Sequence, residues 1–186
     1  VTQQQLDVWL QAYQIADLYP ATPMQQGLLF HSAQDKSAYT SQKLLSFEGA
    51  LDPQLFCQSW QHVLSQHDVL RTVFVDGPQG MMQLVLAHAD INWQFYDIGA
   101  LLPQAQNEEI EAYRLVDKNQ GFNQRQAPMM RLCLWQLSAT SFQLLWTTHH
   151  GIIDGWCNPI VIGEVLTAYH QLVQNQPLSL TDSRAY

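Results

Sequence analysis

Two adjacent histidines, His149 and His150, end an apolar segment and are followed by glycine and by an aspartate at position 154. Successive side chains on a β-strand point to opposite faces, so at most one of the two rings is expected to line a given cavity. An imidazole titrates near neutral pH, and it can take a proton from an attacking amine or alcohol or orient that nucleophile. The segment is therefore a candidate acid–base site on a turn between a strand and a helix.

These residues also allow other interpretations. A pair of histidines in a core strand also fits a purely structural role, and the residues alone leave this open. A metal site built from His149, His150 and Asp154 is disfavoured, because opposite strand faces spoil the coordination geometry and no third histidine stands at a metalloprotease spacing. The chain also has no G-x-S-x-G elbow, P-loop or dinucleotide fingerprint.

Capping signals and hydrophobic spacing predict the elements that position this segment. Thr2 and Thr22 each stand three residues before a glutamine, a capping-box pattern that predicts a helix after each. Helical spacing predicts three more, starting at 52–53, 103 and 158–159. Short apolar runs predict strands at 41–48, 70–75, 81–87, 91–96, 131–137 and 142–148. Without repeats or linkers, these elements indicate one α/β lobe, a mixed β-sheet packed with helices.

The composition excludes several classes of function. The 186 residues carry eight Lys plus Arg against sixteen Asp plus Glu, which gives a formal net charge of -8, and the basic residues are scattered singly. A nucleic-acid surface is therefore not expected. The longest uncharged stretch, 132–153, is too polar to span a membrane, and the polar first residues do not predict a signal peptide. Three cysteines without a C-x-x-C pair suit reduced thiols in a cytoplasmic protein.

Ordered motifs give the chain a resemblance to a known family. His-His-x-x-x-Asp-Gly at 149–155, followed by Trp156, resembles the signature of the condensation domains of nonribosomal peptide synthetases, which belong to the chloramphenicol acetyltransferase-like superfamily. Residues 17–31 are similar to the first motif of that family, and residues 67–74 are similar to its second. A fainter match covers 121–131. Together the motifs keep the family's order over nearly the whole chain.

The resemblance implies a fold, a reaction and partners. Condensation domains consist of two similar lobes with a tunnel between them, and residues 1–186 correspond to the N-terminal lobe, with the second lobe absent from this chain. Such a domain joins a donor thioester on an upstream peptidyl carrier protein to the amine of an aminoacyl thioester on a downstream one. The phosphopantetheine arms belong to the carrier proteins, so the lobe itself is expected to bind no cofactor and no metal. Alone, it is expected to be inactive.

The resemblance also implies roles for the motif residues. His150 is expected to act in the tunnel as the base or as the positioner of the amine, and the N–H of Gly155 is expected to help hold the developing oxyanion. His149 is expected to face away and support the loop. Asp154, Arg71 and Trp156 are expected to support the site, with Arg71 as a buried partner of Asp154. The family usually has an arginine where this chain has Gln66, which weakens that pairing.

The first motif supplies candidates for the tunnel wall. Met24, Gln25, Gly27 and His31 are expected to lie beside the tunnel, and Met24 is also expected to pack. The form of this motif resembles subtypes that accept a donor of D configuration.

Two alternatives stay open at this point. An epimerization domain of a peptide synthetase shares the histidine motif, although Trp156 and the first motif argue against it. A noncatalytic carrier-protein docking module is the other alternative, and the acidic net charge does not favour it.

Overall fold

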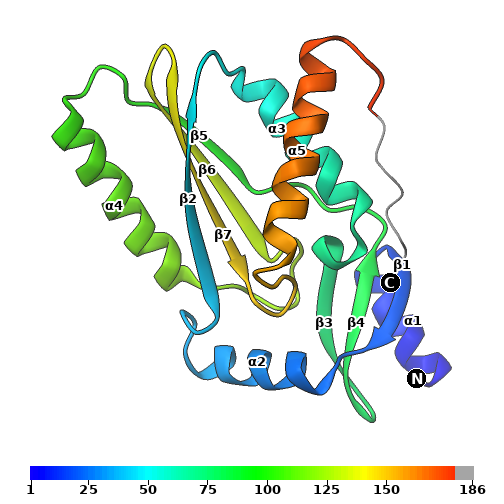
Figure 1. Ribbon diagram of the computed structural model, residues 1–186. Helices are drawn as coiled ribbons and strands as arrows, with labels where there is room; N and C mark the ends of the chain where they lie inside the picture. The colour runs from blue at the N-terminus through cyan, green and yellow to red at the C-terminus, as the bar shows by residue number, and fades with distance from the viewer. Residues whose placement is uncertain (179–186) are drawn as a thin grey trace.

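The computed structural model describes residues 1–178, which form the predicted helices and strands in the predicted order, with one further strand, β1 (Ile15–Pro20), and the short helix η1 (Asp68–Arg71) (Figure 1). The helices are α1 (Gln3–Ala12), α2 (Pro23–Gln34), α3 (Pro53–Gln66), the short 3-10 helix η1 (Asp68–Arg71), α4 (Pro103–Gln120) and α5 (Cys157–Val173). The strands are β1 (Ile15–Pro20), β2 (Thr40–Glu48), β3 (Thr72–Gly77), β4 (Gly80–Leu86), β5 (Trp93–Asp97), β6 (Met130–Ser138) and β7 (Ser141–His149).

Side-chain caps set the start of the first three helices. Thr2 and Thr22 each form a full capping box with the glutamine three residues on, which confirms both predictions. Asp52 caps α3 by accepting hydrogen bonds from the N–H groups of Gln54 and Leu55. Proline occupies the first turn of α2, α3 and α4, where its missing N–H costs no helical hydrogen bond.

The strands form two sheets, where the sequence suggested one layer. The larger sheet has the order β2-β7-β6-β5, and it is mixed because β5 runs parallel to β6 while the other pairs are antiparallel. The smaller sheet has the order β1-β4-β3 and is antiparallel. The sequence pattern missed β1, a mostly exposed edge strand with a register shift and a terminal proline.

Helices cover both faces of the larger sheet. Figure 1 shows α3 and α5 together on one face and α4 on the other. Trp60 of α3 meets Trp146 of β7 edge to face, with ring centroids 5.2 Å apart, inside the main core cluster. On the opposite face, Ile110 of α4 belongs to a smaller cluster with Trp135 and Leu145. No helix within residues 1–178 is long and apolar enough to cross a bilayer.

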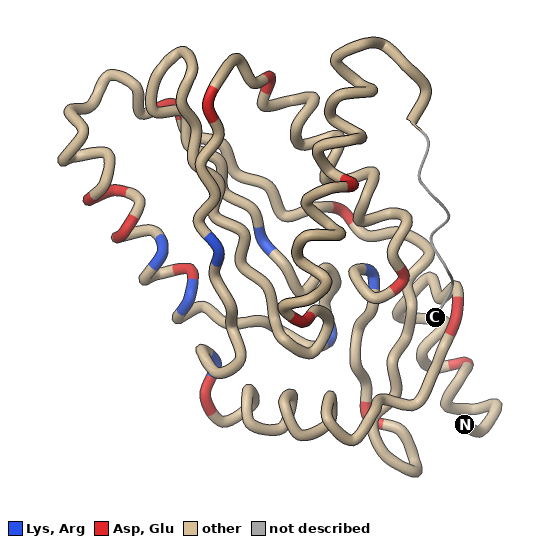
Figure 2. The backbone as a smooth tube through the Cα atoms, in the orientation of Figure 1, with Lys and Arg blue, Asp and Glu red and all other residues tan. Residues whose placement is uncertain are grey.

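A buried ion pair joins α4 to the sheet. Asp117 is 4% exposed, and its carboxylate accepts hydrogen bonds from Arg131 Nε (2.6 Å), Thr147 Oγ1 (2.6 Å) and Gln42 Nε2 (3.0 Å). Arg131 also donates to the carbonyl of Gly121 (2.6 Å), where the loop after α4 begins. One carboxylate thus ties α4 to β2, β6 and β7. The other charged residues of α4 lie nearer the surface: acidic residues are concentrated in the first half of the helix and basic residues follow (Figure 2).

We expect Asp117→Ala to destabilise the chain by about 3–5 kcal/mol, because it leaves the buried guanidinium of Arg131 without its partner. Glu111→Ala is the matched control, since it breaks the exposed pair between Glu111 and Arg114 on the same helix. That change is expected to cost less than about 1 kcal/mol. Urea denaturation of both variants measures the difference, and equal losses would contradict the role given to Asp117.

Candidate functional site

The histidine motif lies on the loop between β7 and α5. β7 is a central strand, hydrogen-bonded to β2 and β6, and it ends at His149. The loop then runs over 150–156 before α5 begins at Cys157. In Figure 1 this loop lies above α2 and to the left of β3. The rigid strand on one side and the helix on the other fix the ends of the loop.

His149 is buried, with 1% of its surface exposed, and both ring nitrogens have partners. The N–H of Gly151 donates to Nδ1 (2.9 Å), and Nε2 lies 2.7 Å from Oγ of Ser32 on α2. The ring of Phe122 lies edge-on at 6.2 Å. Burial, with a smaller contribution from His150, lowers the pKa of His149 to about 4. His149 is therefore neutral near neutral pH.

His150 has the opposite environment. His150 is exposed, and its backbone N–H donates to the carbonyl of Tyr39 (2.9 Å), the residue just before β2. The two histidines therefore do not share one cavity: the ring of His149 is buried at the end of β7, and His150, the first residue of the loop, lies at the surface. Of the two, only His150 is accessible to a substrate in this chain.

Asp154 binds the turn that leads into α5, and it does not bind an arginine. Its Oδ1 accepts hydrogen bonds from the N–H of Trp156 (2.9 Å) and of Cys157 (3.1 Å), and from Sγ of Cys157 (3.1 Å). These bonds, led by that of the thiol, hold the pKa of Asp154 below its usual range. The side chain is exposed, so the buried pair expected from the sequence is wrong.

Arg71 forms a different set of contacts. Its guanidinium donates to Asp68 Oδ1 (2.6 Å) and to the carbonyl oxygens of Leu86 and Ala87. It therefore ties η1 to the end of β4. The sequence pattern did not reveal this pairing, because Asp68 stands three residues before Arg71 and only the 3-10 turn brings the two side chains together.

The two glycines of the loop differ in what surrounds them. A Cβ on Gly151 would lie 2.9 Å from Nδ1 of His149, so the close approach of this backbone requires glycine. A Cβ on Gly155 would meet nothing within 4 Å. Trp156 is 88% exposed, so its side chain does not support the site within this chain.

Only one of the first-motif candidates contacts the loop. Gln25 Nε2 donates to the carbonyl of Gly151 (3.1 Å) and to Gln83 Oε1 on β4 (3.0 Å). Gly27 and His31 are exposed. Met24 is 76% exposed, so the expectation that it packs is wrong. The first turn of α2 directs it away from the core, and Leu29 is the buried residue of this helix.

Ser32 is a contact of the site that the sequence pattern did not reveal. It stands seven residues after Gln25 and therefore on the same face of α2. That spacing is the signal that would have paired the two residues. In residues 1–178 no group of three His, Cys, Asp or Glu side chains is placed to hold a metal ion.

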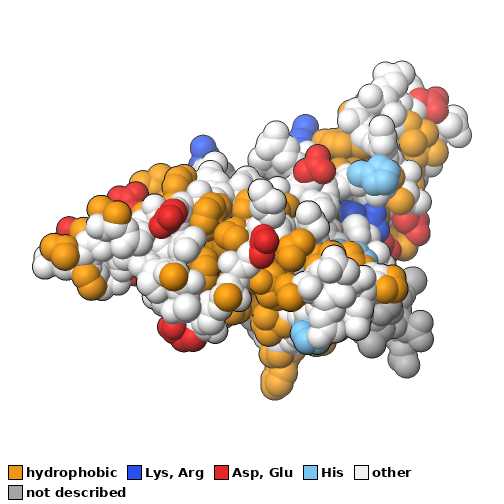
Figure 3. All heavy atoms as spheres, turned by 90° about the horizontal axis from the view of Figure 1, so that it is seen from above, with side chains coloured by type: hydrophobic (Ala, Val, Ile, Leu, Met, Phe, Trp, Pro, Cys, Tyr) orange, Lys and Arg blue, Asp and Glu red, His pale blue; other side chains and the backbone are white. Residues whose placement is uncertain are grey.

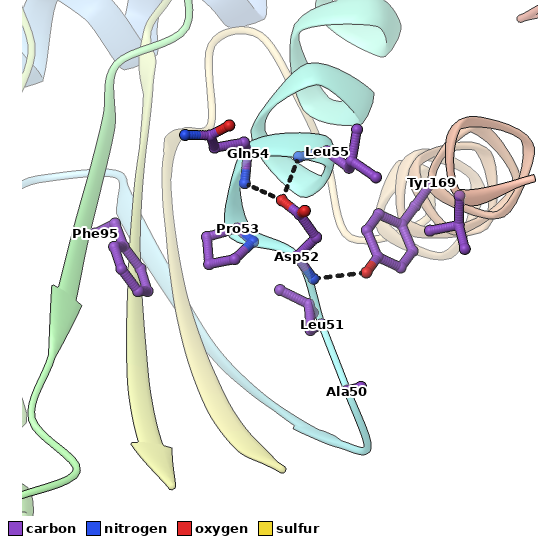
Figure 4. Close-up of a pocket in the computed structure, with 9 residues that line it drawn as sticks. Ala50, Leu51, Asp52, Pro53, Gln54, Leu55, Phe95 and Tyr169 are labelled. Carbon is purple, nitrogen blue, oxygen red and sulfur yellow. Dashed lines mark hydrogen bonds between the residues drawn. The ribbon is translucent and has the colours of Figure 1, made fainter. Parts of the chain in front are cut away.

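A hollow of about 770 Å³ is lined by residues outside the motif loop, most of which Figure 4 labels. It is lined by the start of α3, by Phe95 and by Tyr169. The hydroxyl of Tyr169 accepts a hydrogen bond from the backbone N–H of Asp52 (2.8 Å). Tyr169 is twelve residues beyond the first residue of α5, which is about 18 Å along the helix. The carboxylate of Asp52 is already bound to the N–H groups of α3.

The face seen from above (Figure 3) has many hydrophobic atoms and few, separate basic side chains.

Solved structures identify the class of fold. The crystal structure of the starter condensation domain of rhizomide synthetase matches with a TM-score of 0.79 and 21% identity, over 90% of this chain and 42% of that chain. The first condensation domain of the calcium-dependent antibiotic synthetase, in complex with a substrate analogue, matches with a TM-score of 0.80 and 13% identity, also over 90% and 42%. The fold is the chloramphenicol acetyltransferase-like one, which confirms the α/β prediction.

Sequence comparison identifies the family. Residues 15–186 match the condensation domain family. A linear gramicidin synthase of Brevibacillus parabrevis is 41% identical over 175 residues, which are 92% of this chain and 3% of that protein. A plipastatin synthase of Bacillus subtilis is 35% identical over 184 residues, which are 95% of this chain and 7% of that protein. The chain therefore belongs to the condensation domain family of nonribosomal peptide synthetases, and it spans a small part of these relatives.

We expect the stability of the chain to fall as the pH drops from about 6.5 to about 4. In this range the unfolded chain binds a proton at His149, whose ordinary pKa is 6.5, while the folded chain, with a pKa of about 4, does not. The contribution is fully present above pH 6.5 and is on the order of 3 kcal/mol. Urea denaturation across this range measures it. In His149→Gln this part of the loss should be missing, and an unchanged pH dependence would contradict the assignment.

Asp154→Ala is expected to lower the melting temperature by a few degrees, because it removes the oxygen that accepts the N–H groups of Trp156 and Cys157 at the start of α5. Asp154→Asn should melt close to the parent, since the asparagine side chain keeps an oxygen that can accept the same bonds. Thermal denaturation of both variants separates the effect of the accepting oxygen from that of the negative charge. Equal losses in the two variants would show that the negative charge, and not the accepting oxygen, matters.

Proposed function

We propose that residues 1–186 form the N-terminal lobe of a two-lobe condensation domain that makes amide bonds between substrates on carrier proteins. The family membership and the coverage of about two fifths of solved condensation-domain chains support this. In the reaction, the amine nitrogen of the downstream aminoacyl thioester attacks the carbonyl carbon of the upstream thioester. The C–N bond forms, the C–S bond breaks, and the proton lost by the amine goes to the departing thiolate.

The exposed position of His150 is the observation that carries the proposal. Its backbone is fixed by the carbonyl of Tyr39, while the neighbouring Gly151 is held from two sides. In the proposed reaction, His150 takes the proton of the attacking amine or orients that amine by accepting its hydrogen bond. A fixed loop keeps the ring in the position that proton transfer needs.

Other residues of the motif have supporting parts in this proposal. The N–H of Gly155 stabilises the oxyanion of the tetrahedral intermediate. His149 holds the loop by accepting the N–H of Gly151, and Asp154 accepts the N–H of Cys157, the first residue of α5. The second lobe completes the tunnel, so residues 1–186 alone are inactive.

The partners in this proposal are an upstream and a downstream peptidyl carrier protein and the second lobe. The carrier proteins supply the phosphopantetheine arms, and the lobe itself holds no cofactor. A cytoplasmic setting is proposed because Cys57, Cys133 and Cys157 are free thiols. Acceptance of a D donor stays a prediction from the first motif.

We expect His150→Ala, in a two-lobe domain that contains this lobe, to reduce amide formation by about 100-fold or more while the fold persists. His88→Ala is the matched control, since His88 is also exposed and belongs to another loop. Intact-protein mass spectrometry of the downstream carrier, after mixing both loaded carriers, measures the transferred acyl mass. Full turnover by His150→Ala would overturn its role, and an inverted stereocentre without mass gain would indicate epimerization.

A further inference from the structure

Ser32 and His149 form a short side-chain contact beneath the motif loop. Oγ of Ser32 lies 2.7 Å from Nε2 of His149, and the two residues are 117 positions apart in the sequence. His149 is 1% exposed and Phe122 lies edge-on to its ring, while Ser32 is half-buried. In such a place each polar hydrogen needs a defined acceptor.

The direction of each hydrogen bond follows from the neighbouring groups. Nδ1 of His149 accepts the N–H of Gly151, so in the neutral ring the proton is on Nε2. The hydroxyl of Ser32 donates to the carbonyl of Leu28 (2.9 Å), with that of Ala38 also within reach (3.2 Å). Its lone pairs are therefore available to accept from Nε2–H. The chain of bonds runs from the Gly151 N–H through the His149 ring to the hydroxyl of Ser32.

This direction excludes a serine nucleophile. A histidine activates a serine by accepting its proton, and here the imidazole donates to the hydroxyl. The pair is instead suited to fix one tautomer of His149, which in turn fixes the acceptor for the Gly151 N–H.

Gln25 holds the other side of the same residue. Its Nε2 donates to the carbonyl of Gly151, while its Oε1 accepts the N–H of Thr22 (2.9 Å) in the capping box of α2. The N–H and the carbonyl of Gly151 are thus both tied to one face of α2. His150 directly precedes Gly151, so any shift of that backbone moves the imidazole at the surface.

We propose that Ser32 and Gln25 are positioning residues for the condensation reaction: together with His149 they clamp the backbone of Gly151 and so fix the place of His150. This inference rests on the proposed function, in which His150 handles the proton of the amine. Neither residue touches the substrates in this proposal. Their effect should therefore appear in kcat and leave the KM for the carrier proteins nearly unchanged.

Three variants of the two-lobe domain test the clamp. Ser32→Ala removes the acceptor for Nε2–H, while Ser32→Thr keeps a hydroxyl, and a cavity of about 220 Å³ beside Ser32 has room for the added methyl group. Gln25→Glu keeps the oxygen that caps α2 but removes the amide that donates to Gly151. Ser65→Ala is the matched control, since Ser65 is an exposed helical serine that also bonds to a carbonyl one turn back.

Turnover is measured by mass spectrometry of the downstream carrier. We expect Ser32→Ala and Gln25→Glu to lower kcat by about tenfold to a hundredfold with KM within about twofold of the parent, as a small misplacement of a catalytic group does. Ser32→Thr should restore most of the rate, and Ser65→Ala should match the parent. Unchanged kcat in Ser32→Ala or Gln25→Glu, or an equal loss in Ser65→Ala, would overturn the inference. If Ser32→Ala does not fold, Gln25→Glu and Ser32→Thr decide it alone.

Nitrogen-15 NMR of the histidine side chains gives a readout independent of turnover. In the parent, Nδ1 of His149 should have the shift of an unprotonated ring nitrogen and Nε2 that of a protonated one. Ser32→Ala should mix the two tautomers, and Ser32→Thr should restore a single one. A single, unchanged tautomer in Ser32→Ala would overturn the inference. If the parent forms no amide, the proposed function fails, whereas the NMR comparison still decides whether Ser32 fixes His149.

Discussion

Side chains alternate between the two faces of a β-strand, and β7 is buried on both faces up to its last residue, His149. Thr147 and His149 lie on one face, where Thr147 meets the carboxylate of Asp117 and His149 meets Ser32. Trp146 lies on the other face, in the core beneath α3 and α5. Both faces of β7 are covered, since Thr148, on the same face as Trp146, is 0% exposed. His150 reaches the surface because it is the first residue after the strand, so the end of β7 determines which imidazole is accessible.

The carboxylate of Asp117 and the ring of His149 are stable in buried positions because both have hydrogen-bond partners. The buried carboxylate of Asp117 has Arg131, Thr147 and Gln42, and the neutral ring of His149 has Ser32 and Gly151. Arg131 also stacks over Phe122, 4.1 Å from the ring centroid, and Phe122 in turn covers His149. The two networks thus share Phe122 as a common wall, which links α4 to the loop through packing. A rigid support of this kind suits a site whose acting side chain is itself exposed.

Local signals in the sequence predicted much of the fold. The capping boxes at Thr2 and Thr22 and the cap at Asp52 depend on residues three or fewer positions apart, so the pattern alone located those helix starts. The exposed edge strand β1 was missed, because its partner β4 is more than sixty residues away and its own alternation is weak. In the site, the opposite environments of His149 and His150 followed from the strand, but the partners of Arg71 and Asp154 did not. Asp154 binds groups within three residues, and Arg71 binds Asp68 three residues away and two carbonyl groups at the end of β4, so turn geometry and tertiary contacts rather than residue type decide these pairings.

The loop contains two glycines, and contacts within residues 1–178 explain the need for glycine at only one of them. Gly151 must lack a side chain because His149 lies against its Cα, whereas Gly155 faces open space and Trp156 next to it is almost fully exposed. A buried aromatic ring of this size removes roughly 150–250 Å² of surface from water, so an exposed tryptophan forgoes that stabilisation unless something covers it. The first half of the loop is thus built for the lobe that carries it. The second half, with Gly155 and Trp156, has no such contacts within residues 1–178, and in the proposed domain the second lobe would cover it.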